Sequence, residues 1–246
     1  MSRSHTWACT RAGGIPISPW RWIDTVTRQL ELCRATRGET AVVLALDTDD
    51  PELRGIVATG LERLGCNVAE VIVRSGANME GRDPVDLEAV ALALTAADLI
   101  VDVHGSLVEN SAARDEVLDQ ARVLALDLDG IDDLDELVAH PGLSKRIDRA
   151  IDVLAHGEQL QVSSRSGTLL DIRLADSELR AESGLAVGDG DIAHWPAGSA
   201  WCVPAAESVV GCVVAMPGDL VIESGHMVRS PVRLEIADGT ITDVLG

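Results

Sequence analysis

The chain has 246 residues, of which 46% are apolar, and 40 acidic against 20 basic side chains give it a formal net charge of −20. This apolar content is too high for a disordered chain, and no apolar run approaches the roughly 20 residues that cross a bilayer. The negative charge repels phosphate backbones and anionic membranes, which argues against nucleic-acid or membrane binding and favours a cationic or neutral ligand. The opening residues lack the hydrophobic stretch of a secretory signal, so we expect a cytoplasmic protein.

The first part of the chain alternates between strand and helix patterns. Ala41–Leu46 is a continuous apolar run, typical of a strand buried on both faces. Asp50 and Pro51 then form a helix start, and Gly65 is a helix stop. Strands separated by single helices predict a Rossmann-like, mostly parallel sheet with flanking helices. The expected strands are 41–46, 68–73, 99–103 and 123–126, and the expected helices are 21–37, 51–64, 84–94, 111–120 and 143–155.

After residue 157, short strands separated by turn residues replace the helices. Asp238-Gly239 lies between two of these strands and is a strong hairpin signal. We therefore expect an α/β domain with an N-terminal helix at 1–156 and a smaller β-rich domain at 157–246. The strands expected in the second domain are 159–164, 168–174, 209–215, 220–223, 232–237 and 240–244.

Two familiar ligand sites are excluded by their chemistry. A dinucleotide site needs a glycine-rich turn after the first strand, whereas residues 47–51 read Asp-Thr-Asp-Asp-Pro and would repel a pyrophosphate. The acidic segment 127–136 lacks the ligand spacing of a calcium loop, and we interpret it as a solvated connection.

Histidines offer two further candidate sites. Asp102, His104 and Ser106 alternate at a strand end, but members of a catalytic triad normally come from separate elements. His104 is therefore interpreted as structural, although the carboxyl edge of a parallel sheet is where ligands bind. A metal centre would draw on His194, Glu207 and His226, but no short histidine pair places two ligands on one face. We expect no metal and no cofactor.

Every aromatic residue is a tryptophan. Trp20 and Trp22 lie near the amino terminus with Trp7, and Trp195 and Trp201 lie in one short segment. Tryptophan is large, carries a polar N–H and often marks a binding surface, although it also fills gaps between core and loops. The segment with Trp195 and Trp201 is therefore the first place to look for function.

The order of several short motifs resembles the thermophilic-type metallo-aminopeptidases and the related 2,5-dihydroxypyridine 5,6-dioxygenases. The motifs are Gly38-Glu-Thr-Ala-Val-Val-Leu, Ala97-Asp-Leu-Ile-Val-Asp-Val, Gly167-Thr-Leu-Leu, Trp195-Pro-Ala-Gly, Pro204-Ala-Ala-Glu-Ser-Val-Val-Gly and Val232-Arg-Leu-Glu-Ile-Ala-Asp-Gly-Thr-Ile. The resemblance implies that most metal ligands of such proteins come from a region beyond the position that matches Gly246. In the aminopeptidases, N-x-P-x-E-E-V-F-x-x-P supplies one more ligand, a glutamate. Laid on His194–Pro204, that motif puts Gly198 and Ser199 at the glutamate positions and Trp201 at the aromatic one.

These observations favour binding over catalysis, because a metal-dependent reaction needs several converging ligands. We expect a non-catalytic protein on this scaffold that binds a peptide, such as a precursor peptide in natural-product biosynthesis. The predicted ligand-binding residues are Trp195, Trp201, His194, Ser199 and Glu207, with Trp20 or Trp22 contributing.

Two alternatives stay open. One is a metal-dependent peptidase or ring-cleaving dioxygenase that uses His194, Glu207 and His226. The other is a subunit that pairs with a paralogue and completes that partner's site. The partners expected on the first hypothesis are the peptide, its modifying enzymes and a second copy of the chain in a homodimer.

Overall fold

The computed structural model describes residues 19–74, 90–128, 131, 134, 137, 140–218, 221–222, 226–227 and 229–246. Contacts divide the chain into two compact units, Met1–Gly142 with Glu182–Ala197, and Leu143–Ala181 with Gly198–Gly246. The second unit thus includes a helix that the sequence analysis assigned to the first domain. The domain limits 1–156 and 157–246 stay a prediction.

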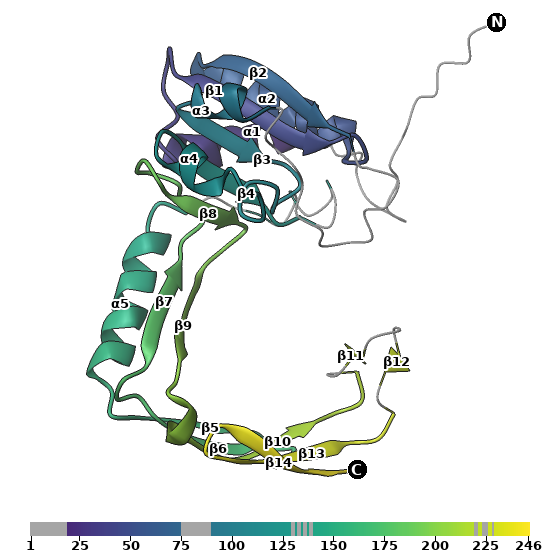
Figure 1. Ribbon diagram of the computed structural model, residues 1–246, viewed down its shortest axis with the longest axis vertical. Helices are drawn as coiled ribbons and strands as arrows, with labels where there is room; N and C mark the ends of the chain where they lie inside the picture. Colours follow the sequence, from purple (N-terminus) through teal and green to yellow (C-terminus); the bar gives the residue numbers. More distant parts are fainter. Residues whose placement is uncertain are drawn as a thin grey trace, which may run out of the picture. The chain divides into compact units, whose positions relative to one another are not determined.

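The first unit is built on a five-stranded parallel sheet in the order β2-β1-β3-β4-β8 (Figure 1). Its strands are β1 (Thr40–Leu46), β2 (Asn67–Val73), β3 (Leu99–Asp102), β4 (Arg122–Leu126) and β8 (Ile192–Trp195). Its helices are α1 (Pro19–Leu32), α2 (Pro51–Leu64), α3 (Ala91–Thr95) and α4 (Arg114–Leu118). This arrangement confirms the predicted α/β class with a mostly parallel sheet and flanking helices.

Alternation along β1 explains why helices cover both faces of this sheet. Val43 belongs to the core that contains α1 and α2, whereas its neighbour Leu44 belongs to the core that contains α3 and α4. Both side chains are almost fully buried, as expected for a parallel strand between two helical layers.

The residues at its two ends predicted helix α2 correctly. The Asp50 carboxylate accepts a hydrogen bond from the N–H of Glu52 at 2.8 Å, and Pro51 is the first helical residue. Gly65 ends the helix in the left-handed conformation, with φ of 85°. Helix α1 ends at Leu32, earlier than expected, and the expected start of the 84–94 helix lies outside the described residues.

The second unit contains a five-stranded antiparallel sheet in the order β14-β13-β10-β6-β5. Its strands are β5 (Gln159–Ser163), β6 (Leu169–Arg173), β10 (Val209–Ala215), β13 (Val232–Ala237) and β14 (Thr240–Leu245). Asp238 and Gly239 both have positive φ and turn β13 into β14, as the hairpin signal predicted. Helix α5 (Leu143–His156) packs on β9 (Ser199–Val203), which pairs with β7 (Glu178–Glu182). Three shorter elements complete the unit: η3 (Ala206–Ser208), β11 (Val221–Ile222) and β12 (His226–Met227).

Strand β8 corrects the expectation that the chain after 157 builds only the second unit. It pairs in parallel with β4, so that Leu126 lies opposite Trp195. Strand β8 is only four residues long and contains a histidine, so its sequence did not predict that it joins the parallel sheet. No described helix is long and apolar enough to span a bilayer. The cytoplasmic location stays a prediction.

Candidate functional site at the carboxyl edge of the parallel sheet

The strand order of the first unit defines one position where ligands are expected to bind. The chain leaves β1 toward β2 on one side, whereas β3 leads to β4 on the other side. The connections that follow β1 and β3 therefore diverge, and open α/β sheets bind ligands in the crevice at such a switch point.

Asp49 and His104 meet at this switch point. The Asp49 carboxylate lies 3.0 Å from Nδ1 of His104, although the two residues are 55 positions apart in the sequence. The same carboxylate accepts the backbone N–H of Leu46 at 2.7 Å, which fixes its orientation at the end of β1. The His104 side chain is 38% exposed. The pair thus holds an accessible imidazole at the edge of the sheet.

Asp102 fixes the turn that carries His104. Its buried carboxylate accepts the backbone N–H groups of Gly105 and Val108, each at 3.0 Å. Burial raises the pKa of Asp102 to about 6, opposed by the backbone donors and by His104. Gly105 has φ of 87°, and a Cβ there would collide with the carbonyl of Leu126. A carboxylate and a glycine together therefore hold this turn against β4.

A second histidine–carboxylate pair lies in the same unit. Nε2 of His194, on β8, is 3.4 Å from the Glu109 carboxylate, and Glu109 follows β3 in the chain. The backbone N–H of His194 also donates to Glu182 at 3.4 Å. Both pairs combine an imidazole with an acid, which suits hydrogen bonding to a neutral or cationic polar ligand.

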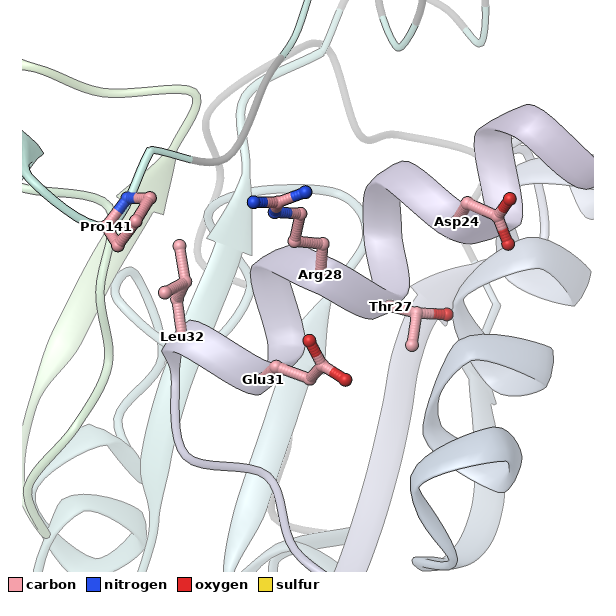
Figure 2. Close-up of a pocket in the computed structure, with 6 residues that line it drawn as sticks. All are labelled: Asp24, Thr27, Arg28, Glu31, Leu32 and Pro141. Carbon is pink, nitrogen blue, oxygen red and sulfur yellow. The ribbon is translucent and has the colours of Figure 1, made fainter.

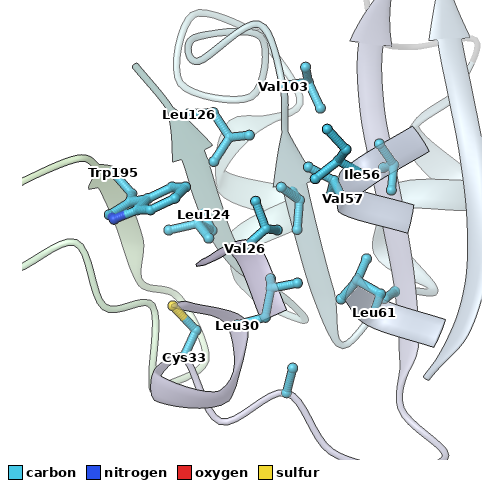
Figure 3. Close-up of a cluster of buried hydrophobic side chains, with 14 of the residues drawn as sticks. Val26, Leu30, Cys33, Ile56, Val57, Leu61, Val103, Leu124, Leu126 and Trp195 are labelled. Carbon is cyan, nitrogen blue, oxygen red and sulfur yellow. The ribbon is translucent and has the colours of Figure 1, made fainter. Parts of the chain in front are cut away.

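The predicted tryptophans fall into different environments. Trp22 and Trp195 are each 5% exposed, and Trp195 lies among Leu124, Val26 and the other core side chains of the first unit (Figure 3). Ligand contact by these two residues would require the core to open, so their binding role stays a prediction. Trp201, on β9, is 39% exposed.

Trp20 is the most exposed of the described tryptophans, at 63%, and charged side chains lie next to its ring. The Arg63 guanidinium lies 5.5 Å from the centre of its ring, a cation–π distance. Arg63 is held in turn by Asp24 at 2.6 Å. These contacts present the ring on the surface of α1.

A shallow pocket of about 340 Å³ lies farther along the same helix (Figure 2). Its lining comes from the exposed side of α1 together with Pro141, and polar and apolar surface contribute about equally to it. Charged residues at helical spacing, such as Asp24, Arg28 and Glu31, mark this side of α1, but their pattern alone did not predict a pocket. A second pocket, of about 420 Å³, lies in the second unit between the end of α5 and the loop before β7.

The remaining predicted residues lie in the second unit or outside the described side chains. Ser199 begins β9 and is exposed. Glu207 is exposed in η3, where its carbonyl accepts a hydrogen bond from Arg173 at 3.1 Å. His226 lies in β12, and its side chain is outside the described part of the structure.

The donor set of a metal site does not assemble among the described residues. No three side chains of His, Cys, Asp or Glu in that part of the chain converge on a common point. The two positions that the family resemblance assigns to glutamates hold Gly198 and Ser199, neither of which supplies a carboxylate. Cys33 is also a poor ligand or nucleophile, because burial raises the pKa of its thiol to about 11.

The strand order and the helices on both faces of the parallel sheet define an α/β protein of the doubly wound class with an appended antiparallel sheet. The chain belongs to the 2,5-dihydroxypyridine 5,6-dioxygenase (NicX) family, whose model matches residues 21–246. It is 24% identical over 243 residues to the 2,5-dihydroxypyridine 5,6-dioxygenase of Pseudomonas putida strain KT2440, covering 94% of this chain and 69% of that protein.

Solved structures agree with this assignment at the level of the fold. The 2,5-dihydroxypyridine dioxygenase of Pseudomonas putida KT2440 matches with a TM-score of 0.74 at 24% identity, covering 94% of this chain and 69% of that one. AmpT of Thermus thermophilus matches with a TM-score of 0.58 at 13% identity, covering 92% and 72%. The resemblance drawn from the motif order is thereby confirmed.

Proposed function

We propose that this chain is a ligand-binding member of the dioxygenase family and that its described part does not build a metal centre by itself. One observation carries the proposal: Gly198 and Ser199 stand where the aminopeptidase motif has its two glutamates, and they lead into a strand that exposes a tryptophan. Without carboxylate ligands at these positions, a metal ion would lack part of its coordination, whereas the exposed Trp201 ring can still contact a ligand.

A peptide fits the exposed side of β9. Ser199, Trp201 and Val203 alternate along this strand, and all three are exposed. An extended peptide can add to a strand by main-chain hydrogen bonds while its side chains contact such alternating residues. The net charge of −20 favours a basic peptide over an acidic one. A precursor peptide of a biosynthetic pathway is the kind of ligand proposed.

Calorimetry with a defined peptide pair tests this function. The probe is the acetylated, amidated peptide Leu-Lys-Val-Lys-Leu, and its partner replaces each lysine with glutamate. We expect binding of the lysine peptide only, and we expect Trp201→Ala to weaken it by about 30-fold, the effect of losing a contact worth about 2 kcal/mol.

The matched control is Leu92→Ala, which removes a side chain that is 85% exposed in the first unit. This variant should bind the lysine peptide as the parent protein does. Equal binding of both peptides, or unchanged affinity in Trp201→Ala, would contradict the proposed peptide site.

Ring-cleaving dioxygenation is the second candidate, and the family match over residues 21–246 favours it. A bound iron ion would supply oxygen activation, and His194, Glu207 and His226 are the ligands that the sequence offers. Elemental analysis of protein purified without chelator, together with oxygen uptake on 2,5-dihydroxypyridine, separates the two functions. Stoichiometric iron that is lost in His194→Ala, with oxygen uptake, would replace the binding proposal by this one.

A further inference from the structure

The antiparallel sheet of the second unit has one apolar side. Strand pairing places Val213 opposite Leu234, and Leu234 opposite Val244. Paired residues of an antiparallel ladder point to the same side, so this row runs across three strands. A parallel row continues through Leu170 and Ile236. Every paired residue on this side of the five strands is apolar or glycine, and we call it face A.

The opposite side of the same sheet carries the charge. There, the Asp171 carboxylate accepts hydrogen bonds from Gln159 at 3.0 Å and from Gln161 at 2.9 Å. Arg233 and Glu235 form an ion pair on the same side. The sheet is therefore amphipathic: the opposite side mixes charged and polar side chains with apolar ones such as Leu169 and Val210, whereas face A carries only apolar residues and glycine.

No described element of the second unit covers face A. Helix α5 packs on β9, and the most extensive contacts of the sheet strands are with one another. On the two edge strands, Val162 is 40% exposed, Ile241 53% and Val244 62%, whereas the large face A residues of the three inner strands are half-buried. An apolar sheet face normally packs against a second layer, and a contiguous exposed one marks an interaction surface.

We propose that face A packs against face A of a second copy of this chain. Because the face carries no charged side chain, two copies can meet there without burying an unpaired charge, and a charged partner would find no counter-ion on it. Two identical apolar sheets form a two-fold, self-complementary contact of the kind that sandwiches use.

The size of the face agrees with a dimer. Five strands about 4.8 Å apart and roughly 17 Å long give about 400 Å² in projection. The accessible area of a corrugated surface is larger than its projection. The area that each copy would bury is therefore near the lower end of the roughly 600–800 Å² that a partner contributes to a specific interface.

Sedimentation equilibrium on the full chain tests the proposal, with Val213→Asp and Val244→Asp as variants. We expect the parent to be a dimer, and each variant to raise the dimer dissociation constant by about 100-fold or more, because an unpaired carboxylate would enter an apolar contact. Val244→Asp is the safer change for folding, because the residue is 62% exposed on the edge strand β14.

The matched control is Val210→Asp. Val210 is on β10, pairs with Asp171 on the side of the sheet opposite face A, and is 54% exposed. This variant should leave the dimer intact, and circular dichroism should show each variant folded. A monomeric parent protein, or a dimer that folded Val244→Asp leaves unchanged, would overturn the proposal. Because face A and the Trp201 strand are separate surfaces, either proposal can fail while the other holds.

Discussion

Asp102 is the residue at the candidate site whose charge depends most directly on its surroundings. Burial raises its pKa from an ordinary 3.8 to about 6. Between these values the folded protein holds a proton that the unfolded chain has released. The stability contributed by this group is therefore complete below about pH 4 and is lost as the pH rises through 6. The full effect is about 3 kcal/mol, from about 1.4 kcal/mol per pKa unit.

Replacing Asp102 with Asn should remove this pH dependence. The amide has no charge to bury, although it loses one acceptor for the turn, which gives a constant offset. Urea unfolding from about pH 4 to about pH 7 should show a flatter profile for Asp102→Asn than for the parent protein. Asp115→Asn is the control, because that side chain is 93% exposed and its removal should leave the slope unchanged. Parallel profiles for Asp102→Asn and the parent would refute the assignment.

At the scale of elements, Arg122, the first residue of β4, connects the end of α1 with the segments that lead into β1 and β3. Its buried guanidinium donates to the carbonyls of Cys33 after α1 and Asp98 before β3, and it pairs with Glu39 at 2.9 Å. Arg122→Met should lower the free energy of unfolding by about 3 kcal/mol, because the acid and the carbonyls lose their common partner. Urea unfolding measures this loss.

The comparison for that change is Arg114→Met, which removes an arginine that is 46% exposed and pairs with Asp115 on the surface. A surface pair contributes about 1 kcal/mol or less, so this variant should remain close to the parent protein. Equal losses in the two arginine variants would mean that the buried network adds no more than a surface pair.

Elements specified by neighbouring residues were predictable from the sequence. The cap at Asp50, the stop at Gly65 and the turn at Asp238 each depend on backbone conformations that a few residues determine. Strand β8 was missed because its assignment to the first sheet depends on pairing with β4, more than 60 residues away in the sequence. Arg122 escaped notice for the same reason, since its partners come from three separate segments.

At the scale of the molecule, the sequence located the candidate site only in part. The carboxyl edge near His104 followed from the strand order, but its contact with Asp49 depends on the packing of β1 beside β3. The tryptophans were grouped by composition, whereas the fold buries Trp22 and Trp195 and exposes Trp20. Burial is a property of the packed chain, and tryptophan suits both a core and a surface.

The net charge of −20 is a property of the whole chain, and it should limit stability at low salt. Like charges repel more strongly in the compact folded state than in the expanded unfolded state. Raising sodium chloride from about 0.1 M to about 1 M shortens the screening length from about 10 Å to about 3 Å. The free energy of unfolding in urea at neutral pH should therefore rise, by on the order of 1 kcal/mol.

The same titration near the isoelectric point, about 4.5, separates this effect from general salt effects. There the net charge is close to zero, so charge screening has little repulsion to relieve and the gain should shrink. A gain of equal size at both pH values would come from exclusion of the salt from apolar surface, which does not depend on the charge of the protein. In that case, self-repulsion would not be what limits the stability of this acidic chain.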